Sequence, residues 1–225
     1  LLPAPHRTDR ITLSPGERAE VVVAMRPGEQ TVLRSYPPEF GGLMGRFSGL
    51  DDSFDVLQLR AAETLAPSAP VPEQLAPAPD LDLADAQVTR SFRMSDSSIN
   101  GQQMVMDRID GVVEVETSGL WEVSSAAGIM HNFHVHDARF QVVSVDGAPP
   151  PPELSGWKDT ILLPPGRRVQ LLLRFTDYTD PDWPYMYHCH VLSHEDQGMM
   201  GQFVVVEPGQ APGVPGGGAH HHHHE

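Results

Sequence analysis

Short runs rich in Val, Leu and Phe recur between turns rich in Pro and Gly, and this pattern restricts the chain to an all-β fold. Its 225 residues include 22 Pro and 20 Gly, which interrupt helices and favour turns. The spacing of the runs after residue 86 predicts one Greek-key β-sandwich. The expected strands are residues 88–94, 112–116, 120–124, 131–136, 140–145, 160–163, 169–175, 185–190 and 202–206.

Composition divides the chain into segments. Residues 1–62 hold two predicted strands, 20–24 and 54–59, too few to close a second sandwich, so we expect the C-terminal part of another domain. Residues 63–86 carry five prolines, which predicts a semi-rigid extended linker. A long loop within one domain is less favoured, because such loops are uncommon in compact domains. Residues 87–208 then form the sandwich.

The two ends of the sequence also carry information. It begins Leu1-Leu2-Pro3 without an initiator Met or a charged leader, so we expect a removed leader or a start inside a longer polypeptide. Residues 209–225 are an expected flexible tail. Its histidines, residues 220–224, are more typical of a purification tag than of a native metal-binding tail.

Charge, apolar run length and the cysteine count exclude several classes of protein. Lys and Arg number 15 and Asp and Glu 30, giving a net charge of −15, and such a surface repels a phosphate backbone, so no nucleic-acid partner is expected. No apolar run approaches the length of a membrane span, so none is predicted. Cys189 is the only cysteine, so an intrachain disulfide is impossible.

Six of the histidines outside the tail fall into two tight groups, while His6 is isolated and is interpreted as an ordinary surface residue. Successive side chains on a strand point to opposite faces. The first group therefore places His134 and His136 on one face and His131 on the other. In the second group, the same alternation places His188 and His190 on one face and Cys189 on the opposite one.

One pair of strands is thus predicted to serve two separate sites. One site gathers only imidazoles, and the other gathers Cys189 and His131, with His194 and Met199 arriving from the following turn. Two His, one Cys and a weak axial Met are the ligands of a blue-copper centre. Zinc is the competitor, but zinc sites favour closed sets of Cys and His in which a Met has no role. Chance placement of these residues is the least favoured interpretation.

These two runs resemble the C-terminal cupredoxin domain of multicopper oxidases, whose signatures are His-Pro-x-His-x-His and His-Cys-His-x-x-x-His-x-x-x-x-Met. The sequence matches the second signature at every ligand position. In the first, Asn132 replaces the usual Pro and Asp137 follows the third His where Gly is common. The resemblance covers residues 88–206, and residues 15–23 resemble the end of the family's middle domain. Bacterial copper-efflux oxidases and laccases are the most similar members.

The resemblance implies a role for each matching residue. The mononuclear type 1 copper would be held by His131, Cys189, His194 and Met199. His134 would bind the type 2 copper of a trinuclear cluster. The type 3 pair of that cluster would be bound by His136, His188 and His190. Glu195 resembles the family's proton-relay acid, although an ordinary solvated carboxylate is an equally favoured interpretation.

Half of the family's cluster ligands are absent from this sequence. The family uses eight histidines there, and the four that this chain lacks normally come as two His-x-His pairs in an N-terminal domain. We therefore expect the chain to be the C-terminal half of an oxidase and to need an N-terminal half as partner.

The predicted function is a laccase-like oxidase that couples one-electron oxidation of a donor to reduction of dioxygen to water. Residues 126–130, just before His131, include no acid, and the sequence has no Met-rich insert, so a phenolic donor is favoured over a metal ion such as Cu(I). The alternatives are a blue-copper electron-transfer module and a copper-free structural relative. Copper–thiolate chemistry and the acidic surface suggest a periplasmic or secreted protein.

Overall fold

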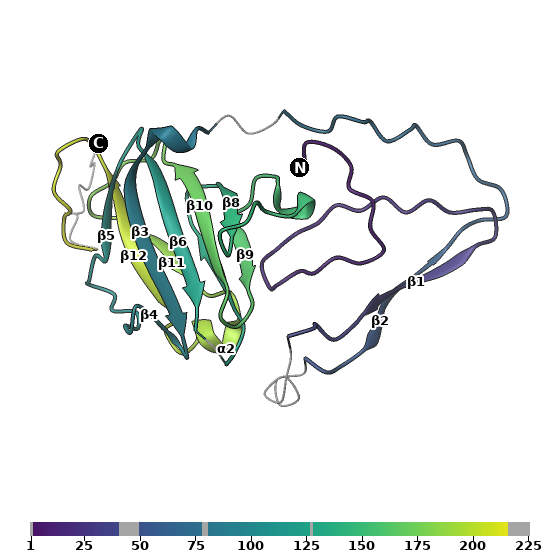
Figure 1. Cartoon of the computed structure of the whole chain (residues 1–225), viewed down its shortest axis with the longest axis horizontal. Coiled ribbons are helices and arrows are strands. Elements are labelled where there is room, and N and C mark those ends of the chain that lie inside the picture. Colours follow the sequence, from purple (N-terminus) through teal and green to yellow (C-terminus); the bar gives the residue numbers. More distant parts are fainter. Residues whose placement is uncertain (1, 41–49, 78–80, 127, 216–225) are drawn as a thin grey trace, which may run out of the picture.

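A computed structural model describes residues 2–40, 50–77, 81–126 and 128–215. Two five-stranded sheets pack face to face and form a β-sandwich (Figure 1), which confirms the all-β prediction. The sequence-predicted histidine tail, residues 220–224, lies outside the described residues. None of the helices in the described part of the chain has the length and hydropathy of a membrane span.

The first sheet has the strand order β4-β3-β6-β10-β8. Its strands β3 and β6 run parallel, while β6–β10 and β10–β8 are antiparallel. The bounds are β3 (Ala86–Ser95), β4 (Ser98–Ile99), β6 (Ser118–Ser125), β8 (Phe140–Val145) and β10 (Arg168–Arg174).

The second sheet has the strand order β5-β12-β11-β7-β9 and carries both histidine groups. Strand β7 lies between β9 and β11, with antiparallel pairing on both sides. The bounds are β5 (Gly111–Glu114), β7 (His131–Val135), β9 (Thr160–Leu163), β11 (Tyr185–His188) and β12 (Met200–Val206). Short helical turns are η1 (Leu83–Asp85), η2 (Pro152–Leu154) and α2 (Leu192–Glu195).

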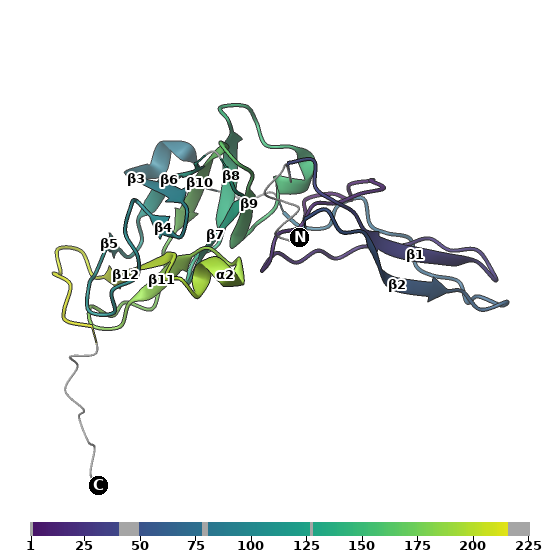
Figure 2. The same cartoon turned by 90° about the horizontal axis from the view of Figure 1, so that it is seen from below.

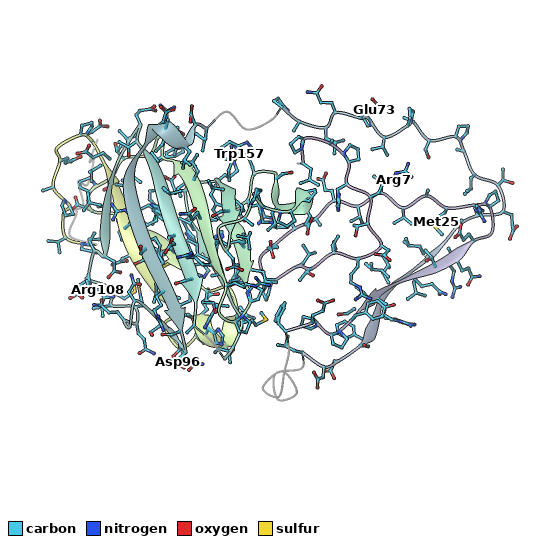
Figure 3. All side chains as sticks on the ribbon, viewed as in Figure 1. Arg7, Met25, Glu73, Asp96, Arg108 and Trp157 are labelled. Carbon is cyan, nitrogen blue, oxygen red and sulfur yellow. The ribbon has the colours of Figure 1, made fainter. Side chains whose placement is uncertain are left out.

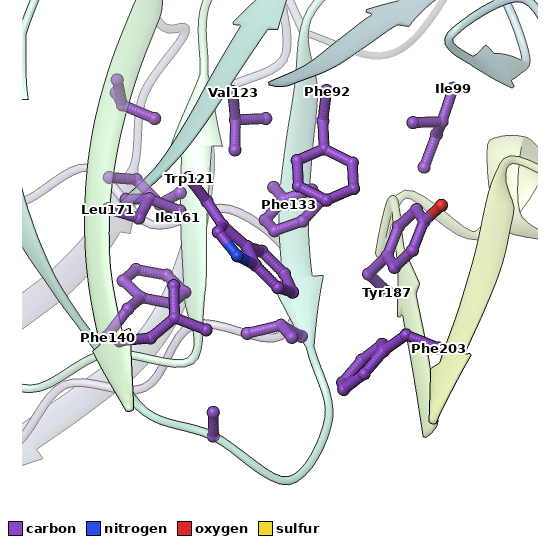
Figure 4. Packing of buried hydrophobic residues seen from close by; sticks show 14 of the residues in the cluster. Phe92, Ile99, Trp121, Val123, Phe133, Phe140, Ile161, Leu171, Tyr187 and Phe203 are labelled. Atoms are coloured by element: carbon purple, nitrogen blue, oxygen red, sulfur yellow. The ribbon is translucent and has the colours of Figure 1, made fainter. Parts of the chain in front are cut away.

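An aromatic cluster fills the space between the two sheets (Figure 4). The Trp121 ring lies 4.9 Å from Phe92 and 5.9 Å from Phe203, measured between centroids. Alternation produces this core, because Trp121 and Val123 of β6 point inward while Glu122 between them is only half-buried. The core therefore holds in position the second sheet, whose strands carry the histidines.

The N-terminal segment differs from its predicted strands. Strand β1 (Gln30–Ser35), which the sequence analysis missed, pairs with β2 (Phe54–Arg60) in an antiparallel ribbon. The strand predicted at residues 20–24 is wrong: Val21, Val22 and Val23 are exposed and pair with no other described segment. A strand needs a partner for its backbone groups, and an apolar run supplies none by itself.

The ribbon lies apart from the sandwich in both views (Figures 1 and 2). Side chains crowd the sandwich, whereas Arg7 and Glu73 on the N-terminal segment are exposed (Figure 3). Residues 63–77 contain no strand or helix. The N-terminal segment returns to the sandwich beside β9. There the Pro15 carbonyl accepts a hydrogen bond from Asn132 of β7.

Removing the central ring tests the importance of this core. We expect Trp121→Ala to lower the free energy of unfolding by about 3–5 kcal/mol, because the side chain is 2% exposed and leaves a large cavity. The matched control Trp183→Ala removes a ring that is 65% exposed and should change stability by only about 0.5 kcal/mol. Urea unfolding of both variants measures this, and equal losses would contradict the assignment of the core.

Candidate metal centres

Adjacent strands β7 and β11 bring the two histidine runs together. His188 pairs with His134 across the ladder, and the His136 N–H donates to the Met186 carbonyl at 2.9 Å. Strand β11 ends at His188, so the prediction of a strand through residue 190 is wrong. The backbone leaves the ladder there to enter α2, yet neighbouring side chains still point to opposite sides.

The first group, called here the cysteine site, consists of His131, Cys189 and His194. Its ligand atoms all lie within 4.8 Å of one another. The Cys189 Sγ and His194 Nδ1 are 3.5 Å apart, close to the roughly 3.6 Å expected when a sulfur and a nitrogen share one ion. Met199 is fully buried beside them: its N–H donates to the His194 carbonyl, and its carbonyl accepts from Cys189.

His131 provides the test of whether a metal fits. The ring is 0% exposed, and neither Nδ1 nor Nε2 has a hydrogen-bond partner among the described residues. A buried imidazole without partners is costly, whereas a metal ion satisfies a ring nitrogen directly. Burial, aided by His194, lowers the pKa of His131 to about 4, so the ring is neutral and able to ligate at physiological pH. The residues present therefore fit a soft metal ion such as copper.

Cys189 needs a cation to ionise. Burial raises the pKa of the thiol, while hydrogen bonds from the backbone of Asn132 and Val191 act in the opposite direction. A metal ion stabilises the thiolate, so metal binding and loss of the proton are coupled.

The second group, called here the imidazole site, consists of His134, His136, His188 and His190. Ligand atoms of the first three lie within 4.8 Å of one another, and the His190 ring centroid is 5.1 Å from that of His188. Burial is the main cause that lowers the pKa of His134 and of His188, and it brings that of His136 to about 4. The lowered pKa values favour the neutral, metal-binding form of His134, His136 and His188.

Hydrogen bonds orient two of these rings. His134 Nδ1 lies 2.9 Å from the Asp159 carbonyl, and His188 Nδ1 lies 3.1 Å from that of Cys189. A carbonyl only accepts, so each Nδ1 carries the proton and each Nε2 offers a lone pair to the site. The Nε2 atoms of His136 and His188 face each other at 3.3 Å.

Glu195 of α2 lies behind two of the rings. Its Oε2 is 3.7 Å from His188 Nδ1 and 3.5 Å from His190 Nδ1. This oxygen and His190 Nδ1 are buried without a hydrogen-bond partner in the described part of the chain. One carboxylate oxygen thus lies beside two imidazoles, although the side chain as a whole is 29% exposed.

Sequence reasoning missed the residues that support the rings. Asp159 and Thr160 both contact His134 Nδ1, and Asp159 also pairs with Arg18. Asp137, noted only as a departure from glycine, has φ +69° and so adopts the left-handed conformation that glycine favours. Spacing along one strand carries no signal for contacts made by the loop before β9.

Comparisons with known proteins identify the family of this chain. The sequence model described as multicopper oxidase matches residues 74–209. The chain is 36% identical over 211 residues to the cell division protein FtsP of Dickeya dadantii, covering 90% of this chain and 43% of that protein. It is 39% identical over 114 residues to the multicopper oxidase mco of Staphylococcus aureus, covering 49% of this chain and 25% of that protein.

A solved structure gives the same result. A laccase-like multicopper oxidase, CueO from Ochrobactrum sp., superposes with a TM-score of 0.66 at 31% identity, over 80% of this chain and 42% of that one. The sandwich thus has the cupredoxin fold of multicopper oxidases. The chain belongs to the multicopper oxidase family. It spans less than half the length of the FtsP relatives and of this solved structure.

The buried His131 predicts a specific pH dependence for the metal-free protein. Its folded pKa of about 4 lies below the model-compound value of 6.5, so the unfolded chain binds more protons between these values. The free energy of unfolding should fall as pH drops from 6.5 to 4. His131→Gln should reduce the slope of this free energy against pH by up to about 1.4 kcal/mol per pH unit. Urea midpoints measured with chelator present test this. The control His6→Gln removes an exposed histidine, and equal slopes in the two variants would contradict the prediction.

Proposed function

We propose that the chain is the C-terminal half of a laccase-like oxidase, in which a donor is oxidised at the cysteine site and dioxygen is reduced at the imidazole site. The observation that carries the proposal is the run His188-Cys189-His190, whose members belong to two donor groups on opposite sides of one backbone. Two unrelated metal sites would not need to share three consecutive residues.

Each donor group is assigned to copper. Type 1 copper would be held by His131, Cys189, His194 and Met199, and the trinuclear cluster by His134 as type 2 ligand and His136, His188 and His190 as type 3 ligands. Copper in these sites supplies reversible one-electron chemistry. Cys189 is bonded through the backbone to both flanking histidines, so it would give electrons a short covalent route between copper ions held in the two sites.

Two residues of the chain, Asp159 and Glu195, have proposed roles in the reaction. The Asp159 carbonyl keeps the proton on Nδ1 of His134, so the Nε2 lone pair would be available to bind copper. Reduction of dioxygen to two waters takes four electrons and four protons, the electrons coming from four one-electron oxidations of the donor. Glu195, between His188 and His190, is the proposed catalytic residue that holds and delivers protons.

The imidazole site supplies four of the eight histidines that the resemblance implies, so we propose a partner: the N-terminal half of the same oxidase, carrying four more. The proposed domains are residues 1–62 as the end of a middle cupredoxin domain, 63–86 as linker, 87–208 as the copper-binding domain and 209–225 as tail. The unpaired apolar residues 21–23 support this, because they need a covering layer. A phenolic donor and a periplasmic or secreted location complete the proposal.

A second candidate function rests on the FtsP relatives, which match nine-tenths of the chain. In this alternative the protein takes part in cell division and has kept the fold without copper chemistry. The donor groups favour the oxidase, because a scaffold gains nothing from burying an unpartnered imidazole next to a thiol.

Copper titration of paired variants tests the assignment. Cys189→Ser should abolish the intense blue absorption of the oxidised protein while the imidazole site still binds copper. His136→Ala should weaken copper binding at the imidazole site while the blue absorption is retained. Oxygen uptake is expected only after the N-terminal half is added. A wild-type chain that binds copper but shows no blue absorption, or binds none, would overturn the oxidase and favour the second candidate.

Glu195 provides a separate test in the assembled oxidase. We expect Glu195→Gln to slow oxygen consumption by about 100-fold or more, because a proton donor is lost, while reduction of the blue centre by the donor is unchanged. Asp196→Asn is the matched control, since it neutralises the exposed neighbouring acid. Stopped-flow absorbance separates the two steps, and equal rates in both variants would exclude Glu195 from proton delivery.

A further inference from the structure

The turn at residues 14–18 in the N-terminal segment lies directly against the imidazole site. Gly16 has φ +83°, and a Cβ atom there would come within 2.4 Å of Cδ2 of His190. The turn is closed from within, because Glu17 accepts hydrogen bonds from the backbone and hydroxyl of Ser14, both at 2.8 Å. A preformed backbone surface therefore packs on the His190 ring.

Asn132 connects this turn to the backbone of His190. The residue is 0% exposed and lies on β7 between His131 and Phe133. Its Oδ1 accepts from the His190 N–H, and its Nδ2 donates to the Pro15 carbonyl at 2.8 Å. A proline at this position has no side-chain polar atom and makes neither bond. The asparagine thus joins three segments that are distant in the sequence.

Two ion pairs fix the same turn to the loop before β9. Lys158 Nζ lies 2.8 Å from Glu17 Oε1, and both side chains are largely buried. Arg18 binds Asp159 through two parallel bonds of 2.7 and 2.8 Å. Asp159 in turn contacts His134 through its carbonyl. The turn therefore reaches the imidazole site from two directions, at His190 and at His134.

We propose that Asn132 is a positioning residue, which together with the turn at residues 14–18 holds His190 in place and so determines the geometry of the imidazole site. Among the described residues, no hydrogen bond or ion pair joins the turn itself to His131, Cys189 or His194, although the backbone of Asn132 also donates to the Cys189 thiol. As far as copper is concerned, the inference rests on the proposed function. The positioning itself is a property of the metal-free chain and is testable there.

A pair of turns with the same Pro-Gly-Glu sequence provides a matched test in the full chain. Gly28 also has a positive φ, +72°, but a Cβ there would meet only the flexible carboxylate of Glu63 at 3.1 Å. Gly16→Ala and Gly28→Ala therefore impose similar backbone strain, and only the first displaces His190. We expect Gly16→Ala to weaken copper binding at the imidazole site by about 10- to 100-fold, with the blue absorption retained, and Gly28→Ala to change neither.

Amide hydrogen exchange in the metal-free chain tests Asn132 without copper. Asn132→Leu removes both hydrogen bonds, so we expect exchange at His190 N–H to quicken about tenfold, the equivalent of one lost hydrogen bond. Asn132→Asp keeps the acceptor and should preserve most of the protection. Unchanged exchange at Leu171 in the sandwich core shows that each variant is folded.

Two results would overturn the inference: equal copper binding in Gly16→Ala and Gly28→Ala, or unchanged His190 exchange in a folded Asn132→Leu protein. Failure of the proposed function is recognised separately. If the wild-type chain binds no copper, the oxidase proposal fails, and the exchange rate at His190 alone decides whether Asn132 positions this residue.

Discussion

The alternation of side chains along residues 188–190 is the constraint on which both candidate sites depend. Cys189 points toward His131 and His194, while His188 and His190 point toward the other imidazoles. Two sides of one backbone thus carry different donor sets, and the covalent spacing of three consecutive residues keeps the two sets close together. Strand β7 repeats the alternation, because His131 belongs to one site and His134 to the other.

Burial gives these sites their chemical character. The sandwich core removes His131, Met199 and Cys189 from water, which keeps the imidazole neutral and the thiol protonated until a cation arrives. Unpartnered nitrogens in such a core cost stability, so the fold retains free energy that a bound metal recovers. The aromatic cluster around Trp121 makes the sandwich rigid. The donor side chains therefore have little room to relax when no metal is bound.

The sandwich and the N-terminal segment differ in how far their apolar residues are buried and their strands are paired. In the sandwich, apolar runs find partner strands and a facing sheet. In the segment, Val21 to Val23 remain exposed, and so do apolar side chains on both faces of the β1–β2 ribbon, such as Val56 and Leu57. The turn at residues 14–18 is different, because it is held by ion pairs and by Asn132. This turn is the part of the segment that contacts the imidazole site.

The sequence by itself determined the all-β class, most strands of the sandwich and the division of the histidines into two groups, because period-two alternation is a local property of the chain. It did not determine that residues 20–24 stay unpaired or that β11 ends at His188, since both depend on which partner backbone is available. The tertiary structure alone decided that Asp159 orients His134, that Glu195 lies between two rings and that Asn132 reaches Pro15. Such contacts join segments far apart in the chain, and their distances are set by packing rather than by spacing.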